Sequence, residues 1–201
     1  FRGRSRDDVS LLEIRMVEPE ALSPPAMIYS DSGQSSPLDW SLQFEFRAQT
    51  LKRFNPLPYL LQLLQEVHGL RAQGGALHSV LNELYSNALE HGVLGLDSGL
   101  KRDAAGFADY YRQRSERLQA LSDGYIRVGL RVEPVGQGGR LIIEVDDSGK
   151  GFNIEQVLAR PLIEQGLCGR GLNLIRRLSR HAEWTDQGRR ACVEFTWDAL
   201  A

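Results

Sequence analysis

The chain has 201 residues, of which 42% are apolar and 25% charged, and its formal net charge is −2. This composition is typical of a globular chain with a hydrophobic core, and the length suits one large domain with an appendage. The near-neutral charge favours neither nucleic acid nor an anionic membrane, so we expect neither as a partner. Two cysteines, Cys168 and Cys192, are too few for a disulfide framework or a zinc site, and no apolar run is long enough for a membrane helix. We therefore expect a cytoplasmic protein.

The first 38 residues differ in composition from the rest of the chain. The apolar run at residues 9–14 (VSLLEI) predicts a strand. Residues 17–38 carry four of the eight prolines among several serines, which is typical of a linker. We therefore expect residues 1–16 to belong to a preceding domain and the main domain to span residues 39–201.

Hydrophobic periodicity in the main domain predicts strands and helices in turn. In chain order, we expect a strand at 42–47, helices at 57–67 and 76–93, a loop at 97–106, a helix at 107–121, a hairpin of 125–132 with 140–146, a helix at 172–179, and a second hairpin of 181–185 with 192–197. This order predicts an α+β two-layer sandwich. Its mixed, mainly antiparallel sheet would be covered on one face by about three helices.

The helix predicted at 76–93 carries a polar stripe opposite its apolar side. At about 100° per residue, Glu83, Asn87, Glu90 and His91 fall on one face. An amide oxygen such as that of Asn87 is a suitable ligand for Mg²⁺, and a carboxylate one turn away can accept a proton from an incoming hydroxyl. Taken alone, such a stripe is more often an ordinary solvated helix face.

Two glycine-containing segments follow. Near residue 146 an apolar strand ends in two aspartates and runs into Gly149 and Gly151, so a carboxylate can face a pocket and accept hydrogen bonds from an amino group. At 166–175, glycines directly precede a helix, whose unpaired N–H groups suit an anion, with Arg170 close by. The second segment matches neither a Walker A loop nor a Rossmann fingerprint. Either segment alone is also compatible with a plain turn or a loop-to-helix junction.

Taken together and in this order, the three segments resemble the motifs of GHKL ATPases, the superfamily of histidine kinases and gyrase B. Residues 83–92 are similar to its N box, Asp147-x-Gly149-x-Gly151 to its G1 box, and Gly169-x-Gly171-Leu172 to its G2 box. The N box is most similar to that of the anti-sigma-factor serine kinases of bacterial partner switching. The resemblance implies the GHKL fold over residues 39–201.

The resemblance also implies ATP and Mg²⁺ as cofactors and a role for each matching residue. Glu83 would be the general base, Asn87 would hold Mg²⁺, and Asp147 would bind the adenine amino group. The other implied nucleotide contacts are His91, Gly149, Gly151, Gly169, Arg170, Gly171 and Leu172.

The implied function is an ATP-dependent serine/threonine kinase, an anti-sigma factor or both, with an anti-anti-sigma (STAS) protein as substrate. One alternative is a non-catalytic ATP-binding module that sequesters a sigma factor or STAS protein. Another is a histidine kinase core, which would need a phosphoacceptor His on a helical hairpin before the N box. Gly69, Gly74 and Gly75 interrupt the segment between His68 and His78, which disfavours it. Members of the group often dimerise, so the resemblance leaves open whether this chain forms a homodimer.

Two further segments bear on this resemblance. Residues 6–12 (RDDVSLL) resemble the closing strand of a PP2C-type serine phosphatase, so we expect residues 1–16 to be the terminal strand of a truncated PP2C-like phosphatase domain. Phosphatases of this kind precede such kinases in some response regulators. Residues 97–123 are longer than the usual connection after the N box, and a helix packed on its own domain is favoured there over a lid or a partner surface. The segment between Gly151 and Gly169 predicts a short ATP lid.

Overall fold

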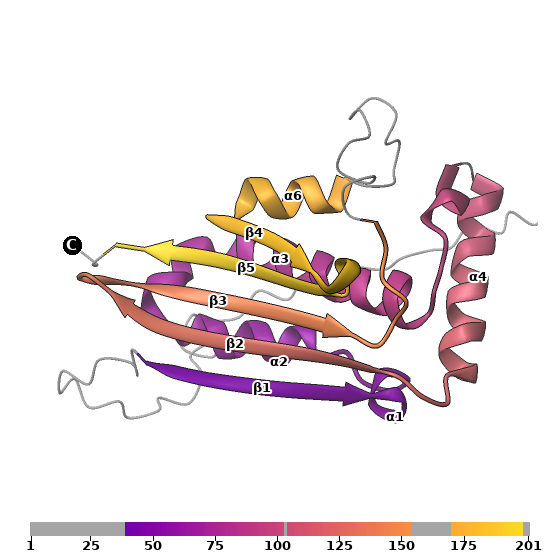
Figure 1. Ribbon diagram of the computed structural model, residues 1–201, viewed down its shortest axis with the longest axis horizontal. Helices are drawn as coiled ribbons and strands as arrows, with labels where there is room; N and C mark the ends of the chain where they lie inside the picture. Colours follow the sequence, from indigo (N-terminus) through magenta and orange to yellow (C-terminus); the bar gives the residue numbers. More distant parts are fainter. Residues whose placement is uncertain (1–38, 103, 154–169, 199–201) are drawn as a thin grey trace, which may run out of the picture. The chain divides into compact units, whose positions relative to one another are not determined.

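The computed structural model describes residues 39–102, 104–153 and 170–198 (Figure 1). All of them belong to the second of two compact units of the chain, Ser35–Ala201. The predicted phosphatase strand at 1–16, the linker at 17–38 and residues 154–169 of the predicted lid lie outside the described residues. None of the helices in the described part of the chain has the length and apolarity that a membrane span requires.

A five-stranded sheet forms one layer of the domain, in the order β1-β2-β3-β5-β4. The strands are β1 (Trp40–Arg47), β2 (Tyr125–Val135), β3 (Gly138–Asp147), β4 (His181–Thr185) and β5 (Arg190–Trp197). Every pairing among these strands is antiparallel. The sheet was predicted to be mixed and mainly antiparallel, and no parallel pair occurs among the described strands. Both predicted hairpins, β2 with β3 and β4 with β5, are confirmed.

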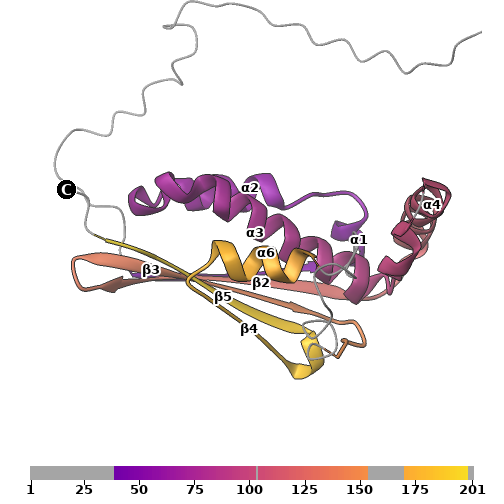
Figure 2. The ribbon, with the colours of Figure 1, turned by 90° about the horizontal axis from the view of Figure 1, so that it is seen from above.

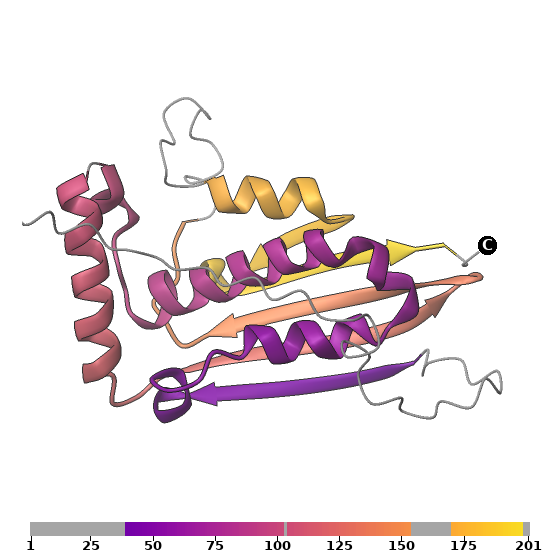
Figure 3. The same cartoon turned by 180° about the vertical axis from the view of Figure 1, so that it is seen from behind.

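Helices form the second layer on one face of this sheet (Figures 2 and 3). The layer consists of α2 (Leu57–Gln65), α3 (Gly74–Ser86) and α6 (Arg170–Leu178), with the short α1 (Ala48–Leu51) following β1 and the 3₁₀ helix η2 (His68–Gln73) joining α2 to α3. The 3₁₀ helix η5 (Asp186–Gly188) lies in the β4–β5 turn. Another pair, the 3₁₀ helix η4 (Ser98–Arg102) and α4 (Ala104–Ala120), stands at one end of the sheet. The predicted α+β sandwich is therefore confirmed.

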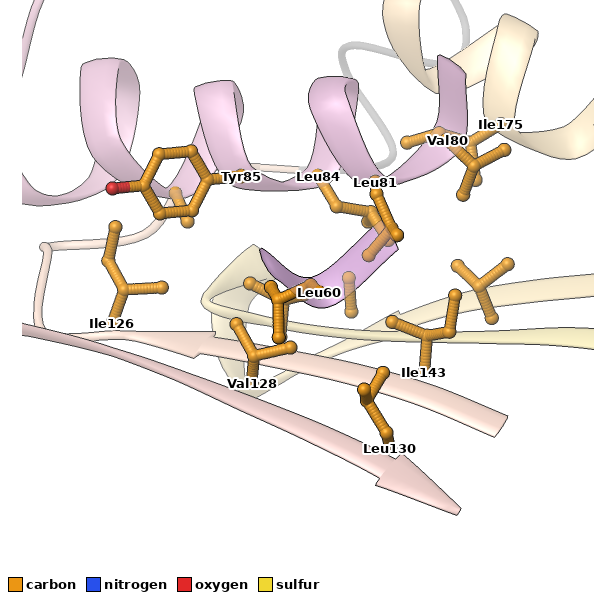
Figure 4. Close-up of a cluster of buried hydrophobic side chains, with 14 of the residues drawn as sticks. Leu60, Val80, Leu81, Leu84, Tyr85, Ile126, Val128, Leu130, Ile143 and Ile175 are labelled. Carbon is orange, nitrogen blue, oxygen red and sulfur yellow. The ribbon is translucent and has the colours of Figure 1, made fainter. Parts of the chain in front are cut away.

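The core lies between the sheet and the helical layer (Figure 4). Apolar residues recur every three or four positions along α3 and every second position along the strands, so each element presents one apolar face. The buried side chains shown there, all but Tyr85 at most 3% exposed, are Leu60, Val80, Leu81, Leu84, Tyr85, Ile126, Val128, Leu130, Ile143 and Ile175. Packing of these faces against one another is what holds α3 on the sheet.

The helix predicted at 76–93 changes its geometry before it ends. Its last seven residues form the π-helix η3 (Asn87–Val93). The wider turn is visible in the hydrogen bond that the N–H of Leu94 donates to the carbonyl of Leu89, five residues back, at 2.8 Å. The prediction of one α-helix was wrong for this segment, and the extra residue in the turn redirects the side chains that follow Asn87.

The prediction of a loop at 97–106 was also wrong. Residues Ser98–Arg102 form η4, and α4 begins at Ala104 rather than at residue 107. Tyr110 anchors α4 because its side chain is fully buried, and the predicted packing of this helix against its own domain is confirmed at that point.

Truncation of Leu81 tests the α3–sheet core. Leu81 is 1% exposed, so Leu81→Ala leaves a cavity and is expected to lower the free energy of unfolding by about 3 kcal/mol in urea denaturation. Leu42→Ala is the matched control, because Leu42 is 42% exposed and its truncation is expected to cost less than about 1 kcal/mol. Equal losses in the two variants would contradict this account of the core.

Candidate functional site

The candidate site lies where three chain segments meet. The end of α3 with η3, the end of β3 and the start of α6 lie toward the same end of the domain (Figure 3). These segments carry the N, G1 and G2 motifs in that order. The fold thus brings together motifs that are spread over residues 83–172 of the sequence.

Glu83 and Asn87 form the first part of the site. The side-chain amide of Asn87 donates a hydrogen bond from Nδ2 to Oε1 of Glu83, at 3.1 Å. This bond orients the amide so that its oxygen faces away from Glu83, and no described residue donates to that oxygen. A carboxylate and an amide oxygen in this arrangement are hard oxygen ligands of the kind that Mg²⁺ binds.

The start of α6 approaches this pair closely. A Cβ placed on Gly171 would overlap the carboxylate of Glu83, so only glycine allows the two elements to come this near. The first N–H groups of a helix have no intrahelical partner and suit an anion. The structure therefore places a helix start beside the carboxylate of Glu83, which is itself bonded to the amide of Asn87.

Asp147 forms the second part, at the end of β3. It is the one charged residue that is buried among the described residues, at 7% exposure. Its Oδ1 accepts a hydrogen bond from the N–H of Gly149, at 2.7 Å. No described residue donates to Oδ2.

Two glycines hold η3 against the end of β3. A Cβ on Gly92 would overlap the carboxylate of Asp147, and a Cβ on Gly149 would overlap the backbone of Gly92. Gly92 was named in the sequence only as the last residue of the N box, and its contact with Asp147 was not predicted. The signal for it was the position of a glycine at the end of a helix.

Burial changes the acid–base behaviour of Asp147. Loss of solvent around the carboxyl, together with the nearby charge of Asp146, raises its pKa to about 6, although the N–H of Gly149 acts in the opposite direction. A carboxyl kept in such a position costs folding free energy when ionised. Perturbed groups of this kind are concentrated at functional sites.

The rest of the G1 segment is fastened to the β4–β5 turn. Gly151 has a positive φ of 74°, and a Cβ there would overlap the carbonyl of Gln187. The N–H of Phe152 donates to the same carbonyl at 2.7 Å. This turn therefore fixes the path of the chain as it leaves β3.

The structure gives fewer contacts for the other predicted site residues. Gly169 lies outside the described residues, and Arg170 begins α6. The side chain of Leu172 is buried in the core, so its contact with a ligand would come from the backbone. Nδ1 of His91 lies 2.8 Å from the carbonyl of Leu96, which it bonds as a donor.

Glu90 and His91 do not join the pair of Glu83 and Asn87. Glu90 binds residues of η4 and α4, and His91 binds the segment that follows η3. The predicted polar stripe is thus divided after Asn87, where the π-helix begins. Sequence periodicity could not show this, because it assumes the ordinary α-helical turn.

Two hollows among the described residues lie away from this site. One is on the open face of the sheet, beside Gly129 and Arg131, and the other lies between the α1–α2 loop, α3 and α4, beside Tyr85 and Arg114. Neither is lined by Glu83, Asn87 or Asp147. In the described part of the chain no three His, Cys, Asp or Glu side chains are grouped to hold a metal ion.

Residues 72–200 match the family described as histidine kinase-, DNA gyrase B-, and HSP90-like ATPases. The match covers more than half of the chain and includes every element of the candidate site. The chain belongs to this family and is an ATP-binding module of the GHKL type, which confirms the superfamily predicted from the three motifs. No curated protein matches the chain at a significant level.

Replacement of Asp147 by Asn is expected to stabilise the protein at high pH. Because the folded-state pKa of about 6 lies above the ordinary value of 3.8, the folded chain binds this proton more tightly than the unfolded chain. The contribution of Asp147 to stability therefore falls as pH rises through this interval, by roughly 2 kcal/mol. In urea unfolding without nucleotide, Asp147→Asn should gain about that much at pH 8 and little at pH 4.

Asp97→Asn is the matched control for this measurement. Asp97 accepts a hydrogen bond from the N–H of Gly99 at 2.8 Å, as Asp147 does from Gly149, but it is exposed. Because burial is the cause assigned at Asp147, substitution of this exposed residue should not reproduce the gain at pH 8. A stability gain of Asp147→Asn that is the same at both pH values would refute the role assigned to burial.

Proposed function

We propose that this chain is an ATP- and Mg²⁺-dependent serine/threonine kinase and anti-sigma factor of bacterial partner switching, and that its substrate is an anti-anti-sigma (STAS) protein. The observation that carries the proposal is the placement of Glu83 beside Asn87 and against the start of α6. A proton acceptor, a Mg²⁺ ligand and an anion-binding helix start then lie at one point. Phosphoryl transfer to a hydroxyl needs these three groups.

In this proposal, one end of the site binds the adenine and the other binds the metal and the phosphates. ATP with Mg²⁺ supplies the γ-phosphoryl group and neutralises the charge that develops on it. Asp147 accepts a hydrogen bond from the adenine amino group, for which it must be ionised. The amide oxygen of Asn87 holds the metal, and the N–H groups at the start of α6 bind phosphate oxygens.

Glu83 acts on the incoming hydroxyl of the partner's serine or threonine. Its Oε1 is held by Asn87, and no described residue donates to Oε2. As the hydroxyl oxygen forms its bond to the γ-phosphorus, Glu83 takes the hydroxyl proton, and the bond from the γ-phosphorus to the β–γ bridging oxygen of ATP breaks, so that ADP leaves. The carboxylate thus lowers the barrier by proton transfer to a positioned base.

Sequestration of a sigma factor or STAS protein is the second candidate function. The observation that favours it is the outer side of α4, where Phe107 and Tyr111 are 38% and 51% exposed and lie with ring centroids 5.3 Å apart. Exposed aromatic pairs of this kind are common in protein interfaces. A histidine kinase core is disfavoured, because residues 68–73 form η2 and lead directly into α3 instead of a helical hairpin.

Calorimetric titration with ATP tests the nucleotide site. Asn87→Ala is expected to weaken binding about tenfold or more with Mg²⁺ and to change it little without Mg²⁺, because it removes the metal ligand. Asp147→Asn is expected to weaken binding by a similar factor under both conditions. Asn82→Ala is the matched control, because Asn82 is an exposed asparagine on the same helix. A folded wild type that binds no ATP would overturn the kinase assignment and favour nucleotide-free sequestration.

Phosphotransfer from radiolabelled ATP to a purified STAS protein tests the reaction. Glu83→Gln is expected to lower the transfer rate by about 10²- to 10⁴-fold while the ATP affinity stays within about threefold. Transfer at the wild-type rate would contradict the role of Glu83. A stable complex without phosphate on the STAS protein would favour sequestration, and acid-labile phosphate on this chain would favour the histidine kinase.

A further inference from the structure

Glu90 lies three residues after Asn87 but is bound by a different part of the chain. Tyr110 donates from its hydroxyl to Oε2 of Glu90 at 2.6 Å, and Arg114 donates from Nε to Oε1 at 2.7 Å. Nζ of Lys101 lies 3.4 Å from Oε2. The three partners all come from η4 and α4, which are called the α4 arm below.

The cluster around Glu90 is sheltered from solvent. The Glu90 side chain is 14% exposed, Lys101 is 20% exposed, and Tyr110 is fully buried. Nζ of Lys101 also lies 3.9 Å from the centre of the Tyr110 ring. Burial by itself would raise the pKa of Glu90, but the bonds from Tyr110 and Arg114 and the charge of Lys101 outweigh it and lower the pKa. Charged groups fixed in this way interact more strongly than an exposed pair.

The same π-helix carries contacts of the nucleotide site. Asn87, its first residue, is bonded to Glu83, and Gly92, near its end, packs against Asp147. The arm holds the chain beyond η3 as well, because Nη1 of Arg117 donates to the carbonyls of Leu94 and Gly95 at 3.0 and 2.7 Å. A π-helix persists where its surroundings hold it, and such turns are frequent at functional sites.

We propose that Glu90 is a positioning residue that couples the α4 arm to the metal-binding end of the nucleotide site. The inference rests on the proposed binding of Mg²⁺ and ATP. Displacement of the arm by a protein partner would loosen η3 and with it the orientation of Asn87. By reciprocity, binding of Mg²⁺ and ATP at Asn87 would stabilise the arm.

The test compares Glu90→Gln with wild type under conditions where circular dichroism shows both to be folded. The neutral amide cannot balance the charges of Lys101 and Arg114, so the contact between η3 and the α4 arm is weakened. ATP affinity measured by calorimetry is expected to fall about threefold to tenfold with Mg²⁺ and to stay unchanged without it. Hydrogen exchange in α4 is expected to slow when Mg²⁺ and ATP bind the wild type and to respond less in the variant.

Two further variants make the test decisive. Glu116→Gln is the matched control, because Glu116 pairs with Arg112 within α4 and its side chain is 60% exposed. Tyr110→Phe removes one hydrogen bond to Glu90 with little change of shape. It replaces Glu90→Gln as the test variant if Glu90→Gln does not fold. It should reproduce the Mg²⁺-specific loss, while Glu116→Gln should not.

The outcomes separate this inference from the proposed function. A wild type that binds no ATP would overturn the proposed function and the coupling with it. A wild type that binds ATP, with variants that retain its Mg²⁺-dependent affinity and its exchange response in α4, would overturn the coupling alone. Lower thermal stability with equal ATP affinity losses in the presence and absence of Mg²⁺ would also overturn it, because it would show a structural role only.

Discussion

The close approach of three backbone segments determines the rest of the site. Glycine at 92 and 149 lets η3 and the chain at the end of β3 lie closer together than a side chain would allow, and glycine at 171 lets the start of α6 lie against the carboxylate of Glu83 on α3. The carboxylates of Glu83 and Asp147 lie at these close contacts. In each carboxylate one oxygen accepts a hydrogen bond, and no described residue donates to the other. The apolar faces of α3 and the sheet supply the free energy that holds the segments together. Packing and chemistry therefore depend on the same helices and strands.

Asp147 shows how function and stability oppose each other here. A carboxyl at this depth is stabilised by one backbone hydrogen bond, and its ionisation is costly because solvent is excluded. An adenine amino group would donate to Oδ2, to which no described residue donates, so ligand binding and ionisation of Asp147 would support each other. A site that is costly without its ligand is common where recognition depends on a buried polar group.

The sequence predicted the sandwich and both hairpins because their apolar residues follow regular periods of two and of three to four. It also selected Glu83 and Gly171 through their motifs, but the contact between the start of α6 and the carboxylate of Glu83 is seen only in the structure. The π-helix could not be predicted, since its turn differs from the period on which the analysis depends. The partners of Glu90 could not be predicted either, because Tyr110 and Arg114 are 20 and 24 residues away and meet it only through tertiary packing. Asp147 was assigned its role by its motif, whereas its pKa depends on burial that only the structure shows.

The position of α4 at one end of the sheet has a consequence for how such a chain can change over evolutionary time. The strands pair with one another without it, and its polar contacts to η3 and the residues just beyond it come from a few side chains, among them Tyr110, Arg114 and Arg117. New outer surfaces can therefore arise on the arm by substitution without disturbing the scaffold that carries the motifs. A lineage could in this way exchange one binding specificity for another while the nucleotide chemistry is inherited intact.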